Sequence, residues 1–125
     1  GENLQRYIFA CDELAEMLDK TGLTKEQKEI VIKIESKLSV IARQGRAFGI
    51  HLILATQRPD STILNGQIKN NINCRICGRA DNVLSQIILD NTEAADQIPD
   101  YAQGRFITQD GTVFQAYWFD DEGGF

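Results

Sequence analysis

The chain has 125 residues, of which 42% are hydrophobic and 25% charged; this is enough for one ordinary core, so we expect a single globular unit. The formal net charge of −5 argues against a generally basic surface for nucleic acids. The sequence has neither a run of about 18 apolar residues, as a membrane span requires, nor a signal peptide. We therefore expect these residues to be soluble and cytoplasmic.

The first predicted strand covers residues 6–11 (RYIFAC) and ends at Asp12 and Glu13. Its nearly continuous apolar run is typical of a strand that is covered on both faces in a parallel sheet. A short helix over residues 14–18 should follow the two acidic residues.

A long amphipathic helix is predicted from about residue 24 to residue 47. Thr24 and Gln27 fit a capping box at its start, and apolar residues then recur at helical spacing.

The second predicted strand covers residues 50–55 (IHLILA) and is followed by Thr56, Gln57 and Arg58. Pro59 restricts the residue before it to extended geometry, which ends the strand. Polar residues therefore follow the carboxyl end of this strand, as they follow the first.

A third strand is predicted over residues 74–78, after a short helix and polar loop over residues 61–71. Asp81 can cap the helix that follows it.

An acidic turn over residues 91–100 leads to a predicted hairpin. Its strands cover residues 105–108 and 112–118, and they flank an Asp110-Gly111 pair, which is favoured in two-residue hairpin turns. We expect the tail, residues 120–125, to be frayed.

Strands that alternate with helices imply right-handed crossovers and a parallel sheet. The predicted fold class is therefore α/β, with a mainly parallel sheet flanked by helices and a C-terminal β-hairpin. A truncated sheet of this kind exposes a strand edge, so we also expect the chain to associate through that edge or through exposed apolar surface.

The three cysteines, Cys11, Cys74 and Cys77, lie in apolar stretches of sequence. Their odd number, without a secretory context, argues against a disulfide framework and fits a reducing cytosol. Cys74 and Cys77 form a CxxC motif, which could serve redox chemistry or half a zinc site. On a strand, however, residues three apart point to opposite faces, and no second ligand pair completes a zinc site. We expect buried structural cysteines.

Ligands of an open parallel sheet bind beyond the carboxyl ends of its strands, where this sequence has Asp12-Glu13 and Thr56-Gln57-Arg58. An apolar strand that ends in Asp-Glu is typical of the nucleotide-hydrolysis strand of P-loop motors, in which the Asp holds magnesium through water and the Glu orients the attacking water. The same pair is also common at helix caps and on surfaces, so it leaves the motor interpretation open.

Several segments resemble the FtsK/SpoIIIE family of DNA translocases. The run RAFGIHLILATQRP, residues 46–59, matches the family almost residue for residue, and the resemblance extends to the segments DELAEML, IARQGRAFGIHL, IKNNI, SQIILD and VFQAYWFDDE. Nearly the whole chain is covered. The resemblance implies that residues 1–125 are the C-terminal part of a RecA-like P-loop NTPase domain, from the Walker B strand onward.

By this resemblance Asp12 and Glu13 form the Walker B pair, with Asp12 holding magnesium through water. Gln57 would sense the γ-phosphate of ATP, and Thr56 would position it at the nucleotide. An amide can donate to a phosphate oxygen and accept from the lytic water, which suits a sensor.

The family resemblance also implies partners for the parent protein. It would use ATP to move double-stranded DNA in conjugation or chromosome partitioning, and it would assemble as a hexameric ring. Any attachment to a membrane would come through segments outside this chain.

Four arginines are candidates for a residue that acts in trans on a neighbouring subunit's nucleotide, or for a subunit contact, and the sequence does not choose among them: Arg43, Arg46, Arg58 and Arg79. They belong to a basic stretch, residues 36–79, in which seven Lys and Arg face one Asp for a net charge of +6, leaving −11 for the remainder. This stretch could face phosphates, solvent or another subunit. His51 is matched in the family but lies within a strand, where we expect a satisfied structural histidine.

Two departures limit the resemblance. Ser85-Gln86 stands where the family commonly has Ser-Arg, which puts in doubt any arginine function at that place. No GxxxxGK[ST] loop occurs in the sequence, so the chain alone should not hydrolyse ATP appreciably; in the parent this phosphate-binding loop would precede Gly1.

Two other interpretations stay open. A related ATPase of a protein secretion system shares the fold and the Asp-Glu pair but moves polypeptide. A non-catalytic interaction module would lack the phosphate-binding loop natively.

Overall fold

The computed structural model describes residues 5–60, 62–64 and 66–118, and the chain divides into two compact units, Gly1–Asn73 and Cys74–Phe125. Each unit has its own cluster of buried apolar side chains. The single core expected from the composition is therefore divided between two units. Residues 120–125, expected to be frayed, lie outside the described residues.

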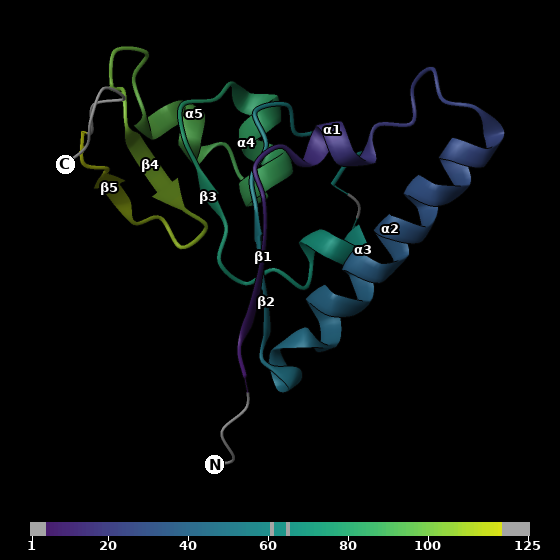
Figure 1. Cartoon of the computed structure of the whole chain (residues 1–125). Helices are drawn as coiled ribbons and strands as arrows, with labels where there is room; N and C mark the ends of the chain where they lie inside the picture. Colours follow the sequence, from purple (N-terminus) through teal and green to yellow (C-terminus); the bar gives the residue numbers. More distant parts are fainter. Residues whose placement is uncertain (1–4, 61, 65, 119–125) are drawn as a thin grey trace. The chain divides into compact units, whose positions relative to one another are not determined.

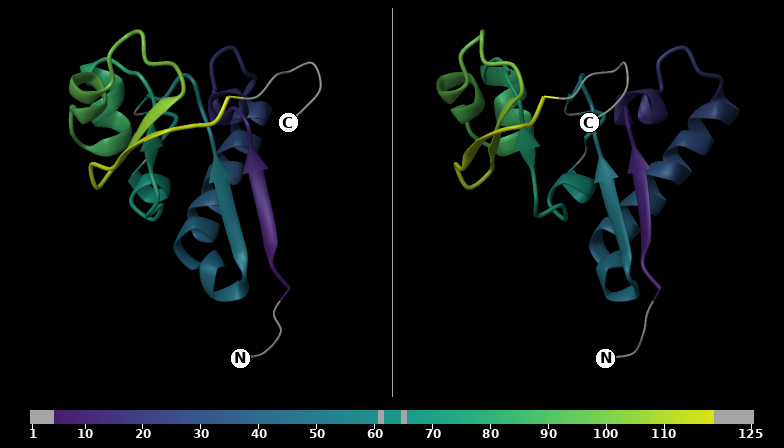
Figure 2. Two further views of the ribbon diagram at one scale, coloured as in Figure 1. Left: turned by 90° about the vertical axis from the view of Figure 1, so that its left-hand side faces the viewer. Right: turned by 60° about the vertical axis from the view of Figure 1, so that its left-hand side comes forward.

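The first unit is built around two parallel strands, β1 (Tyr7–Cys11) and β2 (Ile50–Leu54) (Figure 1). Tyr7 is paired with Ile50 and Cys11 with Leu54, so the two strands are in register from end to end. Figure 2 shows their arrows pointing the same way, with α2 behind them. The predicted parallel pairing is confirmed, and the carboxyl ends of the two strands lie side by side.

The long helix α2 (Lys25–Gln44) begins at the predicted capping box. The Thr24 hydroxyl accepts a hydrogen bond from the backbone N of Gln27 at 3.2 Å, and the Gln27 side chain accepts one from the backbone N of Thr24 at 3.0 Å. The helix ends before the predicted residue 47, because the chain tightens into a 3-10 turn, η1 (Gly45–Phe48).

Gly49 connects η1 to β2 in the left-handed conformation, with φ of 75°. Its carbonyl oxygen accepts a hydrogen bond from the backbone N of Tyr7 at 2.8 Å. A Cβ atom at this position would lie 2.9 Å from the carbonyl oxygen of Gln5, closer than such atoms can approach. Glycine is therefore required for β2 to begin this close to β1.

Apolar packing covers one face of the β1–β2 pair. Leu52 and Leu54 pack against the core cluster that includes Leu14 and Leu18 of α1 (Leu14–Leu18) and Leu38 of α2. A four-residue helix, α3 (Gly66–Lys69), falls within the predicted segment 61–71 and buries Ile68 in the same cluster.

The other face of the β1–β2 pair is exposed. Ile8 is 68% exposed and Ile53 58% exposed, and His51, the register partner of Ile8, is exposed as well. The expectation of strands covered on both faces is therefore wrong for the described residues, and His51, expected to be a satisfied structural histidine, has an exposed side chain. A continuous apolar run indicates that both faces of a strand can be buried, but it does not show which element would cover the second face.

The second unit contains an antiparallel sheet in the order β3 (Ile76–Cys77), β4 (Arg105–Thr108), β5 (Val113–Gln115). The hairpin around Asp110-Gly111 is confirmed, but the backbone N of Thr108 bonds to the carbonyl oxygen of Thr112, so the turn is longer than the predicted two residues. The second strand is also shorter than the predicted 112–118. The strand predicted over residues 74–78 shrinks to two residues and pairs antiparallel with β4, so its assignment to the parallel sheet is wrong. Apolar sequence alone does not reveal a strand's partner.

Two helices pack in the second unit, α4 (Asn82–Leu89) and α5 (Glu93–Gln97). Asp81 caps α4 as predicted, with its carboxylate accepting from the backbone N of Leu84 at 2.8 Å. Ser85 is fully buried; its hydroxyl donates to the carbonyl oxygen of Asn91 at 2.8 Å and accepts from the backbone N of Ala94 at 3.0 Å. This one side chain ties α4 to α5.

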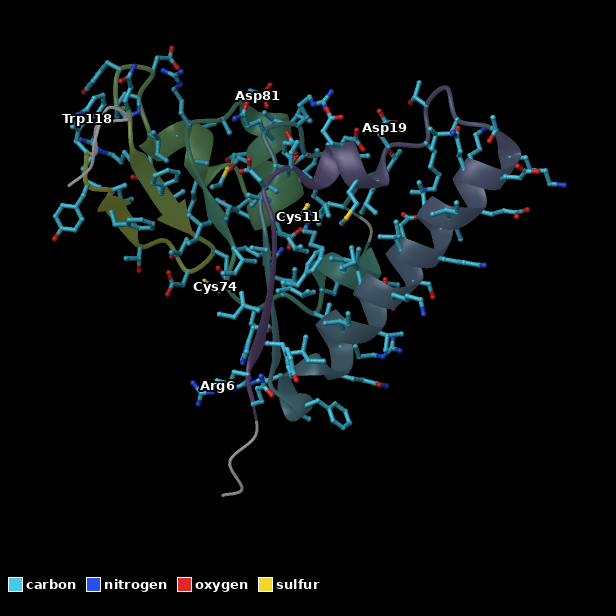
Figure 3. All side chains as sticks on the ribbon, in the orientation of Figure 1. Arg6, Cys11, Asp19, Cys74, Asp81 and Trp118 are labelled. Atoms are coloured by element: carbon cyan, nitrogen blue, oxygen red, sulfur yellow. The ribbon has the colours of Figure 1, made fainter. Side chains whose placement is uncertain are left out.

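The three cysteines have different surroundings: Cys77 is buried, Cys11 is half-buried and Cys74 is exposed, and all three are free thiols. The expectation of a buried cysteine is therefore wrong for Cys74. Figure 3 labels Cys11 at the end of β1.

Among the described residues, no helix is long and apolar enough to cross a membrane.

Candidate active site

The carboxyl ends of β1 and β2 are joined by backbone hydrogen bonds. The backbone N of Ala55 donates to the carbonyl oxygen of Cys11 at 2.9 Å, and the backbone N of Leu14 donates to the carbonyl oxygen of Ala55 at 2.8 Å. The segment Asp12-Glu13 therefore leaves β1 next to the point where Thr56-Gln57 leaves β2, as the order of the strands predicted.

The Glu13 carboxylate connects two elements of this junction. Its Oε1 atom accepts from the backbone N of Gln57 at 3.0 Å, and its Oε2 atom accepts from the backbone N of Ala15 at 3.3 Å, which caps α1. A hydrogen bond from the Thr56 hydroxyl, followed by that from the Gln57 backbone, holds the pKa of Glu13 below its ordinary value. The side chain is therefore an ionised acceptor at neutral pH.

Asp12 is exposed, and its carboxylate takes part in none of the hydrogen bonds or ion pairs described for residues 5–60, 62–64 and 66–118. In those ranges no group of three or more His, Cys, Asp or Glu side chains is arranged to hold a metal ion. Magnesium commonly keeps several water ligands and binds through one or two carboxylates together with phosphates. A single free carboxylate at this position fits that mode of binding.

Gln57 and Thr56 form their hydrogen bonds within the chain through different groups, the backbone N and the side-chain hydroxyl respectively. The backbone N of Gln57 is bonded to Glu13, whereas its exposed side-chain amide enters no hydrogen bond in the part of the chain that is described. The half-buried Thr56 has its hydroxyl oxygen bonded to the backbone N of Arg58 at 3.1 Å. The Gln57 amide is therefore available for a ligand, while the Thr56 hydroxyl is already engaged.

The structure separates the four candidate arginines. Arg58, just beyond β2, forms an ion pair with Glu16 of α1, with both side chains largely exposed. Arg79, in the second unit, donates to the carbonyl oxygen of Asp100. Arg43 and Arg46 precede β2 and are exposed, so the whole strand, roughly 17 Å for five residues, lies between them and Arg58.

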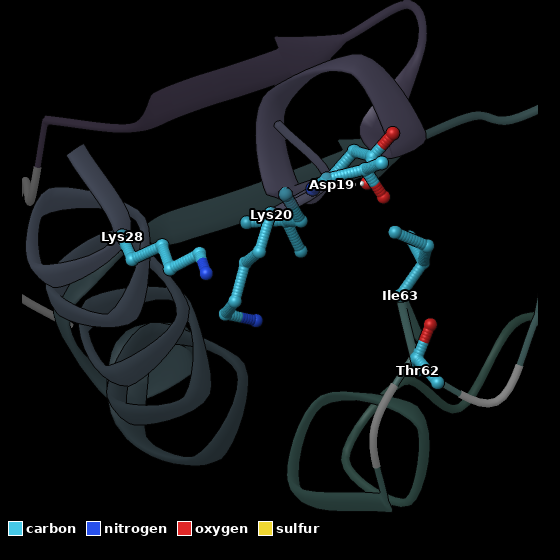
Figure 4. A pocket seen from close by; sticks show the side chains of 7 residues that line it. Asp19, Lys20, Lys28, Thr62 and Ile63 are labelled. Carbon is cyan, nitrogen blue, oxygen red and sulfur yellow. Dashed lines mark hydrogen bonds between the residues drawn. The ribbon is translucent and has the colours of Figure 1, made fainter. Parts of the chain in front are cut away.

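A hollow of ≈ 340 Å³ lies elsewhere in the first unit and is lined by Leu18, Asp19, Lys20, Thr21, Lys28, Thr62 and Ile63. In Figure 4, Lys20 and Lys28 face Thr62 and Ile63 across it. The ammonium of Lys20 is paired with Glu35 at 2.7 Å, and neither Glu13 nor Gln57 lines the hollow. It is therefore separate from the predicted site.

Two contacts at the strand ends were not predictable from the sequence pattern. They are the ion pair between Glu16 and Arg58 and the hydrogen bond from the Gln57 backbone to the Glu13 carboxylate. Glu16 lies one helical turn after Glu13, so the two side chains are expected on the same side of the helix. This spacing is the sequence feature that indicates that Glu16 lies near residues 56–58.

Comparisons with known proteins identify the family, although no protein-family model matches the chain. The chain is 43% identical to the DNA translocase FtsK of Chlamydia pneumoniae over 94 residues, which is 74% of this chain and 10% of that protein. It is 40% identical to FtsK of Haemophilus ducreyi over 88 residues, 70% of this chain and 8% of that protein. The chain belongs to the FtsK/SpoIIIE family. It spans about a tenth of the length of these curated relatives.

Solved structures that resemble this chain confirm the fold class. The conjugation coupling protein TcpA of pCW3, a monomer form with ATPgS, has a TM-score of 0.87 and 46% identity to this FtsK-family chain; the match covers 98% of this chain and 35% of TcpA. The cytoplasmic domain of the type VII secretion ATPase EccC of Thermomonospora curvata has a TM-score of 0.58 at 23% identity, covering 86% of this chain and 11% of that one. The EccC match supports the fold alone.

Proposed function

We propose that this chain supplies the hydrolytic residues of an ATP-driven motor that moves double-stranded DNA, in conjugative transfer or chromosome partitioning. The observation that carries the proposal is the hydrogen bond between the Glu13 carboxylate and the backbone N of Gln57 at 3.0 Å. It brings the acidic pair after β1 together with the polar residues after β2, and the family match supports a hydrolytic role for these residues. Without a phosphate-binding loop, the chain alone should not hydrolyse ATP.

Three side chains have distinct roles in this proposal. The ionised Glu13 accepts a hydrogen bond from the attacking water and orients it. The free amide of Gln57 contacts the γ-phosphate and the same water. Asp12 holds magnesium through water, and the ion supplies positive charge that offsets the charge of the phosphates.

We assign the arginine that acts in trans to Arg43 or Arg46. Both are exposed and precede β2, and neither is in an ion pair described for the chain. Arg58 and Arg79, by contrast, already have partners within the chain. In this proposal the parent is a ring, plausibly of six subunits, in which the arginine of one subunit reaches the nucleotide of the next. Attachment to a membrane would come from segments outside this chain.

ATP hydrolysis by the full-length parent, with and without duplex DNA, tests this function. We expect DNA to stimulate hydrolysis and Glu13→Gln to reduce it by about 10²-fold or more, because an amide is a poor acceptor for a proton from water. Glu29→Gln is a matched control, since Glu29 is an exposed glutamate of α2; it should leave hydrolysis unchanged.

The other outcomes would identify a different function. Hydrolysis that is indifferent to DNA would contradict the DNA motor and favour an ATPase that moves polypeptide. No hydrolysis by the natural sequence would favour a non-catalytic interaction module. Full activity of the Glu13→Gln variant would remove Glu13 from the catalytic site.

A further inference from the structure

We propose that the ion pair between Arg58 and Glu16 is a positioning device, which holds the turn that carries Gln57 against α1. In this arrangement Arg58 serves the site of its own subunit rather than the nucleotide of a neighbouring subunit. The inference rests on the proposed function, because Gln57 is the side chain that the pair would place.

Successive residues of the segment after β2 are fixed to successive residues of the segment after β1. The backbone of Ala55 is bonded to the last residue of β1 and to the first residue of α1. The backbone N of Gln57 is bonded to the Glu13 carboxylate at 3.0 Å, and the ion pair then joins Arg58 to Glu16. Gln57 therefore lies between two attachments to the start of α1.

The turn over residues 56–58 has little freedom of its own. The Thr56 hydroxyl oxygen accepts from the backbone N of Arg58 at 3.1 Å, a local bond that is typical of turns. Pro59 is buried, and its ring restricts Arg58 to extended geometry. The backbone of Arg58 is thereby fixed relative to that of Gln57, so anchoring the Arg58 side chain also anchors Gln57.

Glu16 is a firm anchor for that side chain. It lies one helical turn after Glu13, so the two side chains share one side of α1. Leu14 and Leu18 of the same helix are fully buried in the core cluster of the first unit. The Glu16 carboxylate therefore belongs to a helix that is held in place by its packing.

The size of the expected effect follows from the exposure of the pair. The side chains of Arg58 and Glu16 are 61% and 72% exposed, and ion pairs of this kind contribute little to the stability of a protein. Surface turns, however, open locally at a small cost in free energy. A weak contact can therefore change how often Gln57 is in place without changing the stability of the fold.

The test is a double-mutant cycle in the full-length parent, with Glu16→Gln, Arg58→Gln and both changes together. We expect each single change to lower kcat for ATP hydrolysis by about two- to fivefold, the size that an exposed ion pair supports, with KM for ATP unchanged. The double variant should lose no more than either single variant. In hydrogen exchange without nucleotide, the peptide that contains Gln57 should exchange faster in all three variants, whereas exchange in α2 should stay unchanged.

Glu35→Gln is the matched control, since Glu35 is also a glutamate of the first unit in an ion pair, with Lys20 at 2.7 Å. It should change neither kcat nor exchange at Gln57.

Other results would overturn the inference. A larger loss in Arg58→Gln than in Glu16→Gln, or a raised KM for ATP, would assign Arg58 to the nucleotide. Losses that multiply in the double variant, or unchanged exchange at Gln57, would show that the pair does not hold the turn. If the natural parent does not hydrolyse ATP, the proposed function fails, and exchange at Gln57 alone decides whether the pair holds the turn.

Discussion

Glu13 in the first unit and Ser85 in the second each tie two segments of chain together, but in different surroundings. The Glu13 carboxylate is half-buried and bonded to the backbone N of Ala15 and Gln57, and it retains capacity for further donors. Ser85 is fully buried, with its hydroxyl bonded to Asn91 and Ala94. A polar group whose bonds lie inside the core serves folding, whereas one with capacity left at the surface can also serve chemistry.

The largest loss of stability should come from making a cavity in the core of each unit separately. Leu18 and Ile107 are each 1% exposed, in the first and second cluster respectively. Replacing either by Ala should cost roughly 2–5 kcal/mol, because the removed atoms leave a cavity. In hydrogen exchange we expect Leu18→Ala to weaken protection chiefly in residues 5–73 and Ile107→Ala chiefly in residues 74–118. Equal loss throughout the chain in both variants would show that the two units unfold as one.

Ser85→Ala should cost about 2 kcal/mol, because the carbonyl oxygen of the half-buried Asn91 and the backbone N of the buried Ala94 lose their partner. Urea unfolding measures this loss. Ser39→Ala is the control in the first unit: the Ser39 hydroxyl bonds to the carbonyl oxygen of Glu35 within α2, and alanine favours a helix, so stability should be unchanged or higher. A cost for Ser39→Ala as large as that for Ser85→Ala would contradict the distinction between the two sites.

A smaller contrast separates two helix starts. Thr24 caps α2 with its side chain, whereas Thr92, at the start of α5, makes no side-chain cap bond. Thr24→Ala should therefore cost about 1 kcal/mol, and Thr92→Ala should stay within about 0.5 kcal/mol. Thermal unfolding of the two variants measures the difference, and similar losses would show that the capping box adds nothing.

The smallest expected effect is on stability at acidic pH. The Thr62 hydroxyl, followed by the backbone N of Ile63, lowers the pKa of Asp60 in the folded state. A lowered folded pKa means that the contribution is present above the unfolded pKa and is lost as the pH falls through the folded value. In the acidic range below the ordinary pKa of aspartate, Asp60→Asn should flatten the fall in stability. Stability measured against pH in both proteins tests this, and identical curves would contradict it.

The parts of the fold that were predictable from sequence depended on local patterns. The capping box at Thr24 and the turn at Asp110-Gly111 lie where their residue types indicate, because each depends on a few adjacent residues. The meeting of Asp12-Glu13 with Thr56-Gln57 followed from two parallel strands of equal length. These signals need no knowledge of distant partners.

The errors concern partners that are distant in sequence. The short strand β3 pairs antiparallel with β4, and nothing in its apolar residues distinguishes that partner from a parallel one. His51 and Ile8 are exposed because α2 covers only one face of their strands. Strand pairing and coverage depend on elements many residues away, which a pattern of hydrophobicity does not specify.

Two glycines with almost the same backbone conformation differ in what mutation can do to them. At Gly22, with φ of +74°, no atom of the described residues lies within 4 Å of the place that a Cβ atom would take, whereas at Gly49, with φ of +75°, that place is 2.9 Å from the carbonyl oxygen of Gln5. Substitution of Gly22 by asparagine should therefore be tolerated, since asparagine can adopt this conformation. At Gly49 any side chain would push the start of β1 away from β2. The two strands would then shift relative to each other, and Glu13 and Gln57, which follow their carboxyl ends, would move apart.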